Sequence, residues 1–390
     1  MMERRLTGSA NNPLIRTRYR REARFKSYTV IALFVAFGII AAFFTDIISQ
    51  GYTAFWQTEV KVTLDYNERA ERIGRFALAE EMREVVSRGA VRSIPLEIRN
   101  NPELAGIQRE IWAPAYSRID QYRKGNETLS PELKTLVDQL EAEGRIRTTF
   151  NWAFFNSGDS KLPELAGIFS AAVGSLMVLA VTLAFAFPIG VMAAIYLEEF
   201  APDNKLTQAI EVNINNLAAV PSIIFGLLGL AVFINTFGVP RSSALVGGLT
   251  LGLMTLPIII ISTRAALRAV PDPIRLGGFA MGCSRWQVVR DHVMPLSLPG
   301  ILTGTIIGLA QAMGETAPLI IVGMIAYIPE APSSIFESAT VLPAQVFTWA
   351  SEPRKAFVEK TGAGIIVLLA ILLTLNATAV LLRRKFERRW

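Results

Sequence analysis

Long apolar runs constrain this chain more than any other feature of its sequence. A helix needs about 20 apolar residues to cross a hydrocarbon core of about 30 Å, and runs of this kind recur along the chain. We predict membrane-spanning helices at residues 28–48, 167–196, 209–234, 244–262, 300–328 and 364–382. Charged residues make up only 18% of the 390 positions, against about 25% in soluble proteins. These features predict an α-helical polytopic membrane protein.

Basic residues predict which ends of the helices face the cytoplasm. Segments 1–27 and 383–390 carry eight and five Lys or Arg residues, and segment 263–295 carries five more. With six spans, all three lie on one side of the membrane, and the excess of positive charge marks that side as cytoplasmic. The first span is too long for a removable signal peptide and is interpreted as an uncleaved anchor. This asymmetry explains the basic character of the chain without nucleic-acid binding.

The polar block between the first two spans predicts a separate domain. Residues 49–166 should form a small α+β extracytoplasmic domain without disulfides, because Cys283 is the only cysteine. "EVKVTLDY" alternates as a strand does, with Val60, Val62 and Leu64 on one face. Residues 68–86 show helical spacing, and Ser130 followed by Pro131 predicts the start of another helix that stops at Gly144. One cysteine and one histidine also exclude a structural zinc site.

The cytoplasmic loop 263–299 is too polar to span the membrane and too patterned for a linker. Asp272 is expected to cap a helix that Gly282 ends in the left-handed conformation. Ser284 and Gln287 predict a capping box for a second helix, which Pro295 ends. That helix carries an apolar stripe of Trp286, Val289 and Val293. The pattern fits either a turn lying on the lipid surface or a knob that docks into another protein.

Polar groups in the third and fifth spans mark a candidate path. Pro221 should break the third helix and free backbone N–H groups that can face an anion. The asparagines beside it serve either as interhelical hydrogen-bond partners or as path lining. The candidate residues for the substrate path or a subunit interface are Asn213, Asn215, Asn216, Ser222, Arg264, Arg268, Gln311, Glu315, Thr316 and Pro318.

Glu315 is the only charged residue in the apolar run 296–328. A bare carboxylate in lipid is unfavourable, so it must face protein or water. Three roles remain open: an ion pair with an arginine of a partner subunit or with Arg264 or Arg268, positioning of an arginine in the path, or a proton relay. A carboxylate repels phosphate, so Glu315 is not expected to be a ligand for that anion.

The cytoplasmic loop resembles the coupling loop of ATP-binding-cassette (ABC) importer permeases. The resemblance rests on Leu276-Gly277-Gly278, Gly282, His292 and Met294-Pro295, where the family pattern has Glu-Ala-Ala, Gly, Ile and Leu-Pro. The family's glutamate is therefore replaced by leucine. The resemblance implies contact with an ATPase, and the candidate coupling residues are Gly277, Gly278, Gly282, Trp286, Val289, His292 and Pro295.

Three further motifs are similar to the A-type (PstA) permease of phosphate-specific transport systems. They are "NNLAAVPSIIFGL" (215–227), "LPIIIISTRAALRAVP" (256–271) and "GETAPL" (314–319). Residues 49–165 look like an extension found in a subset of these subunits. Related permeases often carry an arginine four residues before the glutamate, where this chain has Gln311.

The resemblance implies a permease core over residues 167–382 with five helices, in a bacterial inner membrane protein with both termini in the cytoplasm. It implies an inorganic phosphate importer that comprises a paralogous permease, an ATPase dimer and an external phosphate-binding protein. The chain has no Gly-Lys dipeptide and so no phosphate loop of the Walker type. We therefore expect no enzyme activity and no cofactor or metal on this chain, with ATP and Mg²⁺ on the ATPase.

Three other functions remain open: an ABC importer for another oxyanion or small solute, a proton-coupled secondary carrier that uses Glu315, and a membrane-anchored sensor. The sensor predicts an output domain inside the cell, and the cytoplasmic segments are too short to hold one.

Overall fold

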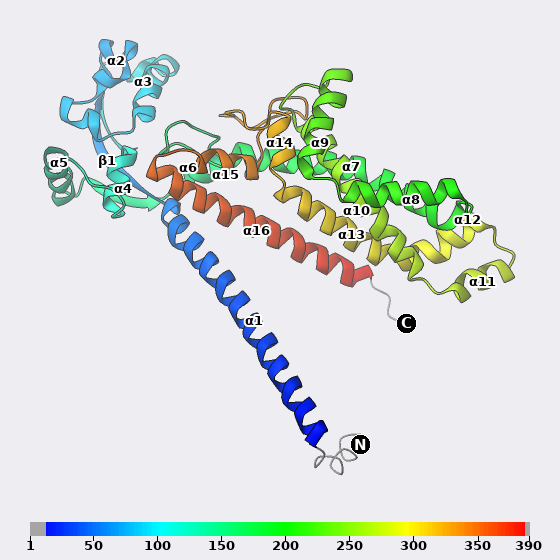
Figure 1. Cartoon of the computed structure of the whole chain (residues 1–390). Helices are drawn as coiled ribbons and strands as arrows, with labels where there is room; N and C mark the ends of the chain where they lie inside the picture. The colour runs from blue at the N-terminus through cyan, green and yellow to red at the C-terminus, as the bar shows by residue number, and fades with distance from the viewer. Residues whose placement is uncertain (1–12, 387–390) are drawn as a thin grey trace. The chain divides into compact units, whose positions relative to one another are not determined.

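The computed structural model describes residues 13–386, and the chain divides into two compact units after Gln50 (Figure 1). The first unit is the helix α1 (Pro13–Gly51), which contains the apolar run predicted at 28–48. An 18-residue window within the candidate span Thr17–Phe55 has a mean hydropathy of 2.5. α1 is therefore long and apolar enough to cross a membrane. The basic residues predicted within 1–12 and 387–390 lie outside the described residues.

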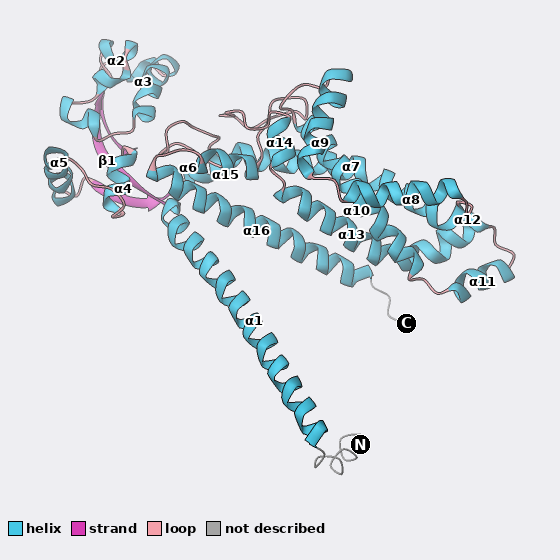
Figure 2. Cartoon of the chain, in the orientation of Figure 1, coloured by secondary structure: helices cyan, strands magenta, loops and turns pink. Residues whose placement is uncertain are grey.

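The second unit begins with a small antiparallel sheet, drawn in magenta in Figure 2. Its strands are β1 (Trp56–Asp65), β2 (Gln108–Pro114) and β3 (Ile146–Phe150), in the order β2-β1-β3. Val60 pairs with both Ala113 and Ile146, so β1 is the central strand. Val60, Val62 and Leu64 are buried, which confirms the strand and the face predicted from their alternation.

Three helices complete the core of this domain: α3 (Arg88–Asn100), α4 (Ser117–Arg123) and α5 (Pro131–Ala142). The start of α5 at Pro131 after Ser130 is confirmed, and Gly144 has a φ of +68° just beyond its end.

The single helix predicted over residues 68–86 is wrong. The segment forms a short helix, α2 (Glu68–Arg72), and two 3₁₀ turns, η3 (Gly74–Ala77) and η4 (Glu80–Glu84). Ile73 is extended, and the chain then passes so close to α3 that a Cβ on Gly74 would lie 2.0 Å from the Val91 carbonyl oxygen. Tertiary packing against α3 has therefore overridden the local helical pattern.

The remainder of the unit is helical. After the short α6 (Trp152–Asn156), the helices are α7 (Phe169–Ile195), α8 (Lys205–Ala218), α9 (Ser222–Leu228), α10 (Ala244–Arg268), α11 (Asp272–Ala280), α12 (Arg285–Val288), α13 (Met294–Gly314), α14 (Ala317–Ile321), α15 (Leu342–Ala350) and α16 (Lys355–Phe386). Among the described residues, five helices are long and apolar enough to cross a membrane, or up to six if one bent pair counts as a span.

The bent pair is the predicted third span. Helix Lys205–Ala218 meets Ser222–Thr236 at 106°, so residues 209–234 do not form one straight helix. The break falls at Pro221, as predicted, because proline has no N–H to donate and disfavours helix in the residue before it.

The predicted fifth span, 300–328, is wrong at both ends. The helix begins at Arg285, runs through Pro295 and ends at Gly314. A π-turn, η8 (Val289–Val293), ends two residues before Pro295, and this wider turn accommodates a residue that has no N–H. Pro295 therefore does not end the second loop helix, which continues directly into α13.

Glycines let the membrane helices approach closely. A Cβ on Gly248 would lie 2.5 Å from Val181, and one on Gly252 would lie 2.6 Å from Phe185, so α10 packs directly on α7. In the same way, a Cβ on Gly226 would lie 2.7 Å from Pro318 Cα, which joins α9 to α14. Small residues at such crossings are the usual basis of helix packing in lipid.

Buried polar contacts fasten the sheet domain to the last helix. Lys124 Nζ lies 2.8 Å from Glu359 Oε1, and Gln121 also donates a hydrogen bond to Glu359. Lys360 Nζ donates to the Ala166 carbonyl oxygen at 2.8 Å. Because these groups are almost fully buried, the domain and α16 form one packed body.

We predict that Gly226→Ala destabilises the protein by about 1–3 kcal/mol, because its methyl group must displace backbone at Pro318. Gly308→Ala is the matched control, since its Cβ would meet nothing closer than 3.7 Å. Thermal unfolding in detergent should show a lower midpoint for the first variant alone. Equal midpoints for the two variants would contradict this packing.

Candidate coupling and translocation site

The loop between α10 and α13 folds into a compact helical turn. α11 ends at Ala280, and Gly282, two residues later, has a φ of +82°, which confirms the predicted left-handed glycine. The capping box of Ser284 and Gln287 is also confirmed. The predicted cap at Asp272 is wrong by one position, because Pro271 precedes the helix and Asp272 is its first residue.

Gly278 and His292, two of the candidate coupling residues, lie where α11 packs against the next helix. A Cβ on Gly278 would lie 2.8 Å from Val288 and 3.4 Å from the imidazole carbon Cδ2 of His292. A Cβ on Gly277, one position earlier, would point into open space, with no other atom within 4 Å. A cluster of Leu267, Val270, Val288 and Val293 fills the space beneath α11. Of the two glycines, Gly278 therefore packs against the next helix, whereas Gly277 faces open space.

The apolar stripe predicted on the second helix is divided between the interior and the surface. Val289 and Val293 are buried, whereas the side chain of Trp286 is 54% exposed. Leu276, Phe279 and Met281, on or just after α11, are exposed as well. Exposed apolar side chains at the end of a short rigid turn are suited to contact with another protein or with lipid.

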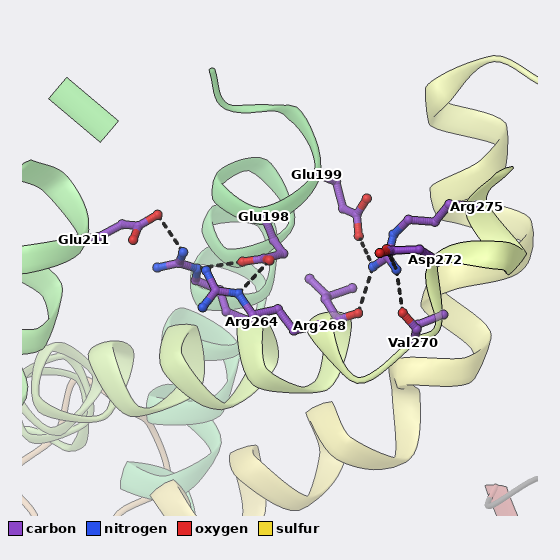
Figure 3. Close-up of polar contacts among 9 residues, drawn as sticks. Glu198, Glu199, Glu211, Arg264, Arg268, Val270, Asp272 and Arg275 are labelled. Carbon is purple, nitrogen blue, oxygen red and sulfur yellow. Dashed lines mark hydrogen bonds and ion pairs between the residues drawn. The ribbon is translucent and has the colours of Figure 1, made fainter. Parts of the chain in front are cut away.

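An arginine anchors α11 to the helices beneath it (Figure 3). Arg275 Nη2 lies 2.8 Å from Glu199 Oε1 and donates to the Leu267 carbonyl oxygen at 2.8 Å. Its Nη1 donates to the Val270 carbonyl oxygen at 2.6 Å. Glu199 follows α7 in the π-turn η6 (Tyr196–Phe200), so this one guanidinium joins α7, α10 and α11.

Two more arginines extend the same set of contacts. Arg264 pairs with Glu198 at 3.2 Å and with Glu211 of α8 at 2.6 Å, and Arg268 pairs with Glu198 at 2.7 Å. We call the full set the arginine–glutamate network: Glu198, Glu199, Glu211, Arg264, Arg268 and Arg275 (Figure 3). It connects α7, α8, α10 and α11, whose relative positions it fixes at this end of the bundle.

Sequence reasoning missed the three glutamates of the network. The signal was available, because "LEEF" (197–200) and Arg264 with Arg268 lie at the predicted cytoplasmic ends of the second and fourth spans. The suggestion that Arg264 or Arg268 pairs with Glu315 is wrong, because both are engaged by Glu198.

Glu315 lies where the chain leaves α13 and before α14 begins. Its backbone is extended, with φ −78° and ψ 123°, and its side chain is half-buried. No ion pair among the side chains that the structure describes includes Glu315. Gln311, one turn earlier, is exposed, and Pro318 is buried against Gly226. Thr316 accepts a backbone hydrogen bond from Ile320 at the start of α14.

The candidate asparagines lie on one exposed helix. Asn213, Asn215 and Asn216 belong to α8, no residue of which is buried. Asn213 donates to the Ala209 carbonyl oxygen of its own helix at 2.7 Å, and no described hydrogen bond links these asparagines to another helix. Ser222 begins α9 on the other side of the break at Pro221. α8 therefore presents its amide groups outside the packed bundle.

Comparison with known families and proteins shows which proteins this chain is similar to. The family described as "Binding-protein-dependent transport system inner membrane component" matches residues 186–390, and a domain of unknown function (DUF3333) matches residues 12–75. The chain is 31% identical to the phosphate transport system permease protein PstA of Mycobacterium leprae over 228 residues, which cover 57% of this chain and 73% of that protein.

A second relative gives a similar match. The phosphate transport system permease protein PstA 1 of Mycobacterium tuberculosis (strain CDC 1551 / Oshkosh) is 29% identical over 231 residues, 58% of this chain and 75% of that protein. Among solved structures, a chain of the MetNI methionine ABC transporter in inward-facing conformations aligns with a TM-score of 0.46 at 20% identity. The alignment covers 57% of this chain and 98% of that one.

We predict that Arg275→Gln destabilises the protein more than the double variant Glu199→Gln, Arg275→Gln. The single change leaves the nearly buried Glu199 without its partner, which costs more than removing both charges. Thermal unfolding in detergent should rank wild type above the double variant and the double variant above the single one. Arg290→Gln, in an exposed pair with Asp291, should change the midpoint little. A double variant no more stable than Arg275→Gln would contradict the pairing.

Proposed function

Because the chain belongs to the binding-protein-dependent transport system inner membrane component family and is a permease subunit of an ABC importer, we propose that its substrate is inorganic phosphate. The observation that carries this proposal is the match to PstA proteins of phosphate transport systems across most of their length. The family match over residues 186–390 includes the break at Pro221, the network arginines and Glu315.

The permease works with a partner permease and an ATPase. We propose that the partner permease is a paralog, that the ATPase is a dimer carrying ATP and Mg²⁺, and that an external binding protein delivers phosphate. In this assembly the exposed apolar side chains of the α11–α12 turn dock into the ATPase. Leu276 stands where related permeases carry glutamate, so this contact is apolar where theirs includes a charge.

The arginine–glutamate network supplies the mechanical link in this proposal. Closure of the ATPase dimer displaces α11, and Arg275 transmits the displacement to Glu199 at the end of α7. Arg264 and Arg268 carry it to Glu198 and, across to α8, to Glu211. Because ionic contacts among partly buried groups resist separation, the four helices move together rather than one by one.

The two broken helices support an anion path. α9 and α14 both begin after a break in a membrane helix and pack against each other through Gly226 and Pro318. The first turn of a helix leaves backbone N–H groups without a partner inside that helix, and the half-buried Ser222 adds a hydroxyl at the start of α9. Donors of this kind compensate an anion in a low-dielectric interior. Glu315 then faces a cation from the partner permease, which keeps its carboxylate from repelling the substrate.

A related importer for another oxyanion is the second candidate, and Gln311 favours it. Related permeases often carry arginine at this position, one helical turn before the glutamate. Without that charge, selectivity for phosphate depends on groups of the partner chain.

The orientation follows from the same proposal. The basic termini and the α11–α12 turn face the bacterial cytoplasm, and the β1–β3 domain faces outward. The protein itself is a multi-pass protein of the inner membrane.

Reconstitution in vesicles tests the proposal. With the partner permease, the ATPase and the binding protein present, we predict phosphate uptake that requires ATP and stops when the ATPase is inactivated by substitution. Uptake should persist when the proton gradient is collapsed. Sulfate or molybdate taken up in place of phosphate would favour the second candidate, and uptake driven by the proton gradient alone would contradict both.

A further inference from the structure

The β1–β3 domain carries a cleft lined mainly by arginines. Its volume is about 460 Å³, and its walls come from the turns η3 and η4 and from the start of α3. We call it the arginine cleft; its lining residues are Ile73, Gly74, Arg75, Arg83, Arg88, Val91 and Arg92. Four of the seven are arginines and none is acidic, so the cleft gathers positive charge without a compensating carboxylate.

Close packing fixes the backbone of the cleft. The approach of Gly74 to the Val91 carbonyl oxygen holds η3 against α3, and this places Arg75 across from the first turns of that helix. Arg83 Nε donates to the Arg75 carbonyl oxygen at 3.2 Å, which joins η4 to the same wall. The cleft is therefore built by the fold of the domain.

Aromatic rings hold three of the guanidinium groups. Arg75 and Arg83 lie over the ring of Phe76, at 5.1 and 5.6 Å from its centroid. Arg88 lies over the ring of Tyr116 at 5.6 Å. A guanidinium stacked on a ring keeps its in-plane N–H donors available, and these donors match the oxygens of a phosphate or carboxylate.

These charges are almost uncompensated. The one described ion pair of a cleft arginine joins Arg83 to Glu80, which is not part of the lining, at 3.9 Å, and the Glu80 side chain is 93% exposed. Where side chains are described, no ion pair includes Arg75, Arg88 or Arg92. In the adjoining smaller cleft, by contrast, Arg118 is paired with Glu127 at 3.0 Å and Glu84 is part of the wall.

The position of two arginines in α3 is unfavourable for the protein alone. Arg88 is the first residue of the helix and Arg92 lies one turn later, while the first turn contains no acidic residue. Positive side chains oppose the positive end of the helix dipole, and like charges four residues apart repel. A bound anion would reverse both effects, because it would face the α3 terminus and the guanidinium groups together.

We propose that the arginine cleft binds a small polyanion that carries two or more phosphate groups, of the oligophosphate class. Its volume falls in the range of about 300–1,000 Å³ found for small-molecule sites, and the four arginines exceed what one orthophosphate can engage in bidentate contacts. The concave shape favours a small ligand over a protein surface. This site lies outside the transport path and does not depend on the substrate proposed above.

Calorimetric titration of the full chain in nanodiscs of zwitterionic lipid tests the proposal. Tripolyphosphate should bind with a stoichiometry of one, and orthophosphate should bind at least tenfold more weakly. The double variant Arg88→Gln, Arg92→Gln should lose tripolyphosphate affinity by tenfold or more. The matched control Arg99→Gln, Arg109→Gln removes the same charge from exposed positions outside the cleft and should leave the affinity unchanged.

Thermal unfolding separates loss of the site from loss of the fold. Without ligand, the midpoint of Arg88→Gln, Arg92→Gln should equal or exceed that of wild type, because the substitutions relieve repulsion in α3. Tripolyphosphate should raise the midpoint of wild type and of the control variant only.

Several results would overturn the proposal. These are no tripolyphosphate binding, an equal loss of affinity in both double variants, or orthophosphate binding as tight as tripolyphosphate. Binding of phosphatidylglycerol vesicles or of the external binding protein through Arg88 and Arg92, without tripolyphosphate binding, would assign the cleft to a lipid or a protein instead. None of these measurements involves transport, so their outcome is independent of the uptake experiment.

Discussion

The ion pairs around Glu198 and Glu199 are the interaction on which the rest of the permease depends. Two adjacent carboxylates at the end of α7 would repel each other and lose hydration, and three arginines from α10 and α11 compensate them. The same arginines reach Glu211 of α8 and the carbonyl oxygens that end α10. The network thereby holds the α11–α12 turn, the helices α7, α8 and α10, and the helix break that follows α8 in one arrangement. In the proposed transporter, this arrangement carries the work of ATP hydrolysis into the membrane.

Local rules predicted local features well. The alternation in β1, the break at Pro221, the left-handed Gly282 and the capping box of Ser284 each depend on a few neighbouring residues, and the structure contains all of them. Predictions failed where packing between residues far apart in the sequence determines the local structure. Residues 68–86 have helical spacing, but Gly74 packs against α3 and divides them. Pro295 remains within a long helix because a π-turn precedes it, and hydropathy gave no sign that Glu315 leaves the helix.

The sequence predicted which regions contribute to the candidate site, but it did not predict the contacts between their side chains. Composition marked the loop, the broken third span and the isolated glutamate as places where polar groups enter an apolar chain. It did not pair Arg264 and Arg268 with Glu198, because pairing requires the relative depth and rotation of α7 and α10, which close glycine contacts determine. The arginine cleft was also beyond sequence reasoning, since its residues come from two turns and a helix that only tertiary structure brings together.

The central claim is that α11 moves as one body with α8 through the arginine–glutamate network. Spin labels at Asp272 and Leu206, both exposed, would report it in a chain whose Cys283 is replaced by serine. The account predicts one unchanged distance distribution between the labels in the nucleotide-free and ATP-bound assembled transporter. A shift of about 5 Å, one helical pitch, between the two states would show that α11 moves independently and would contradict the account.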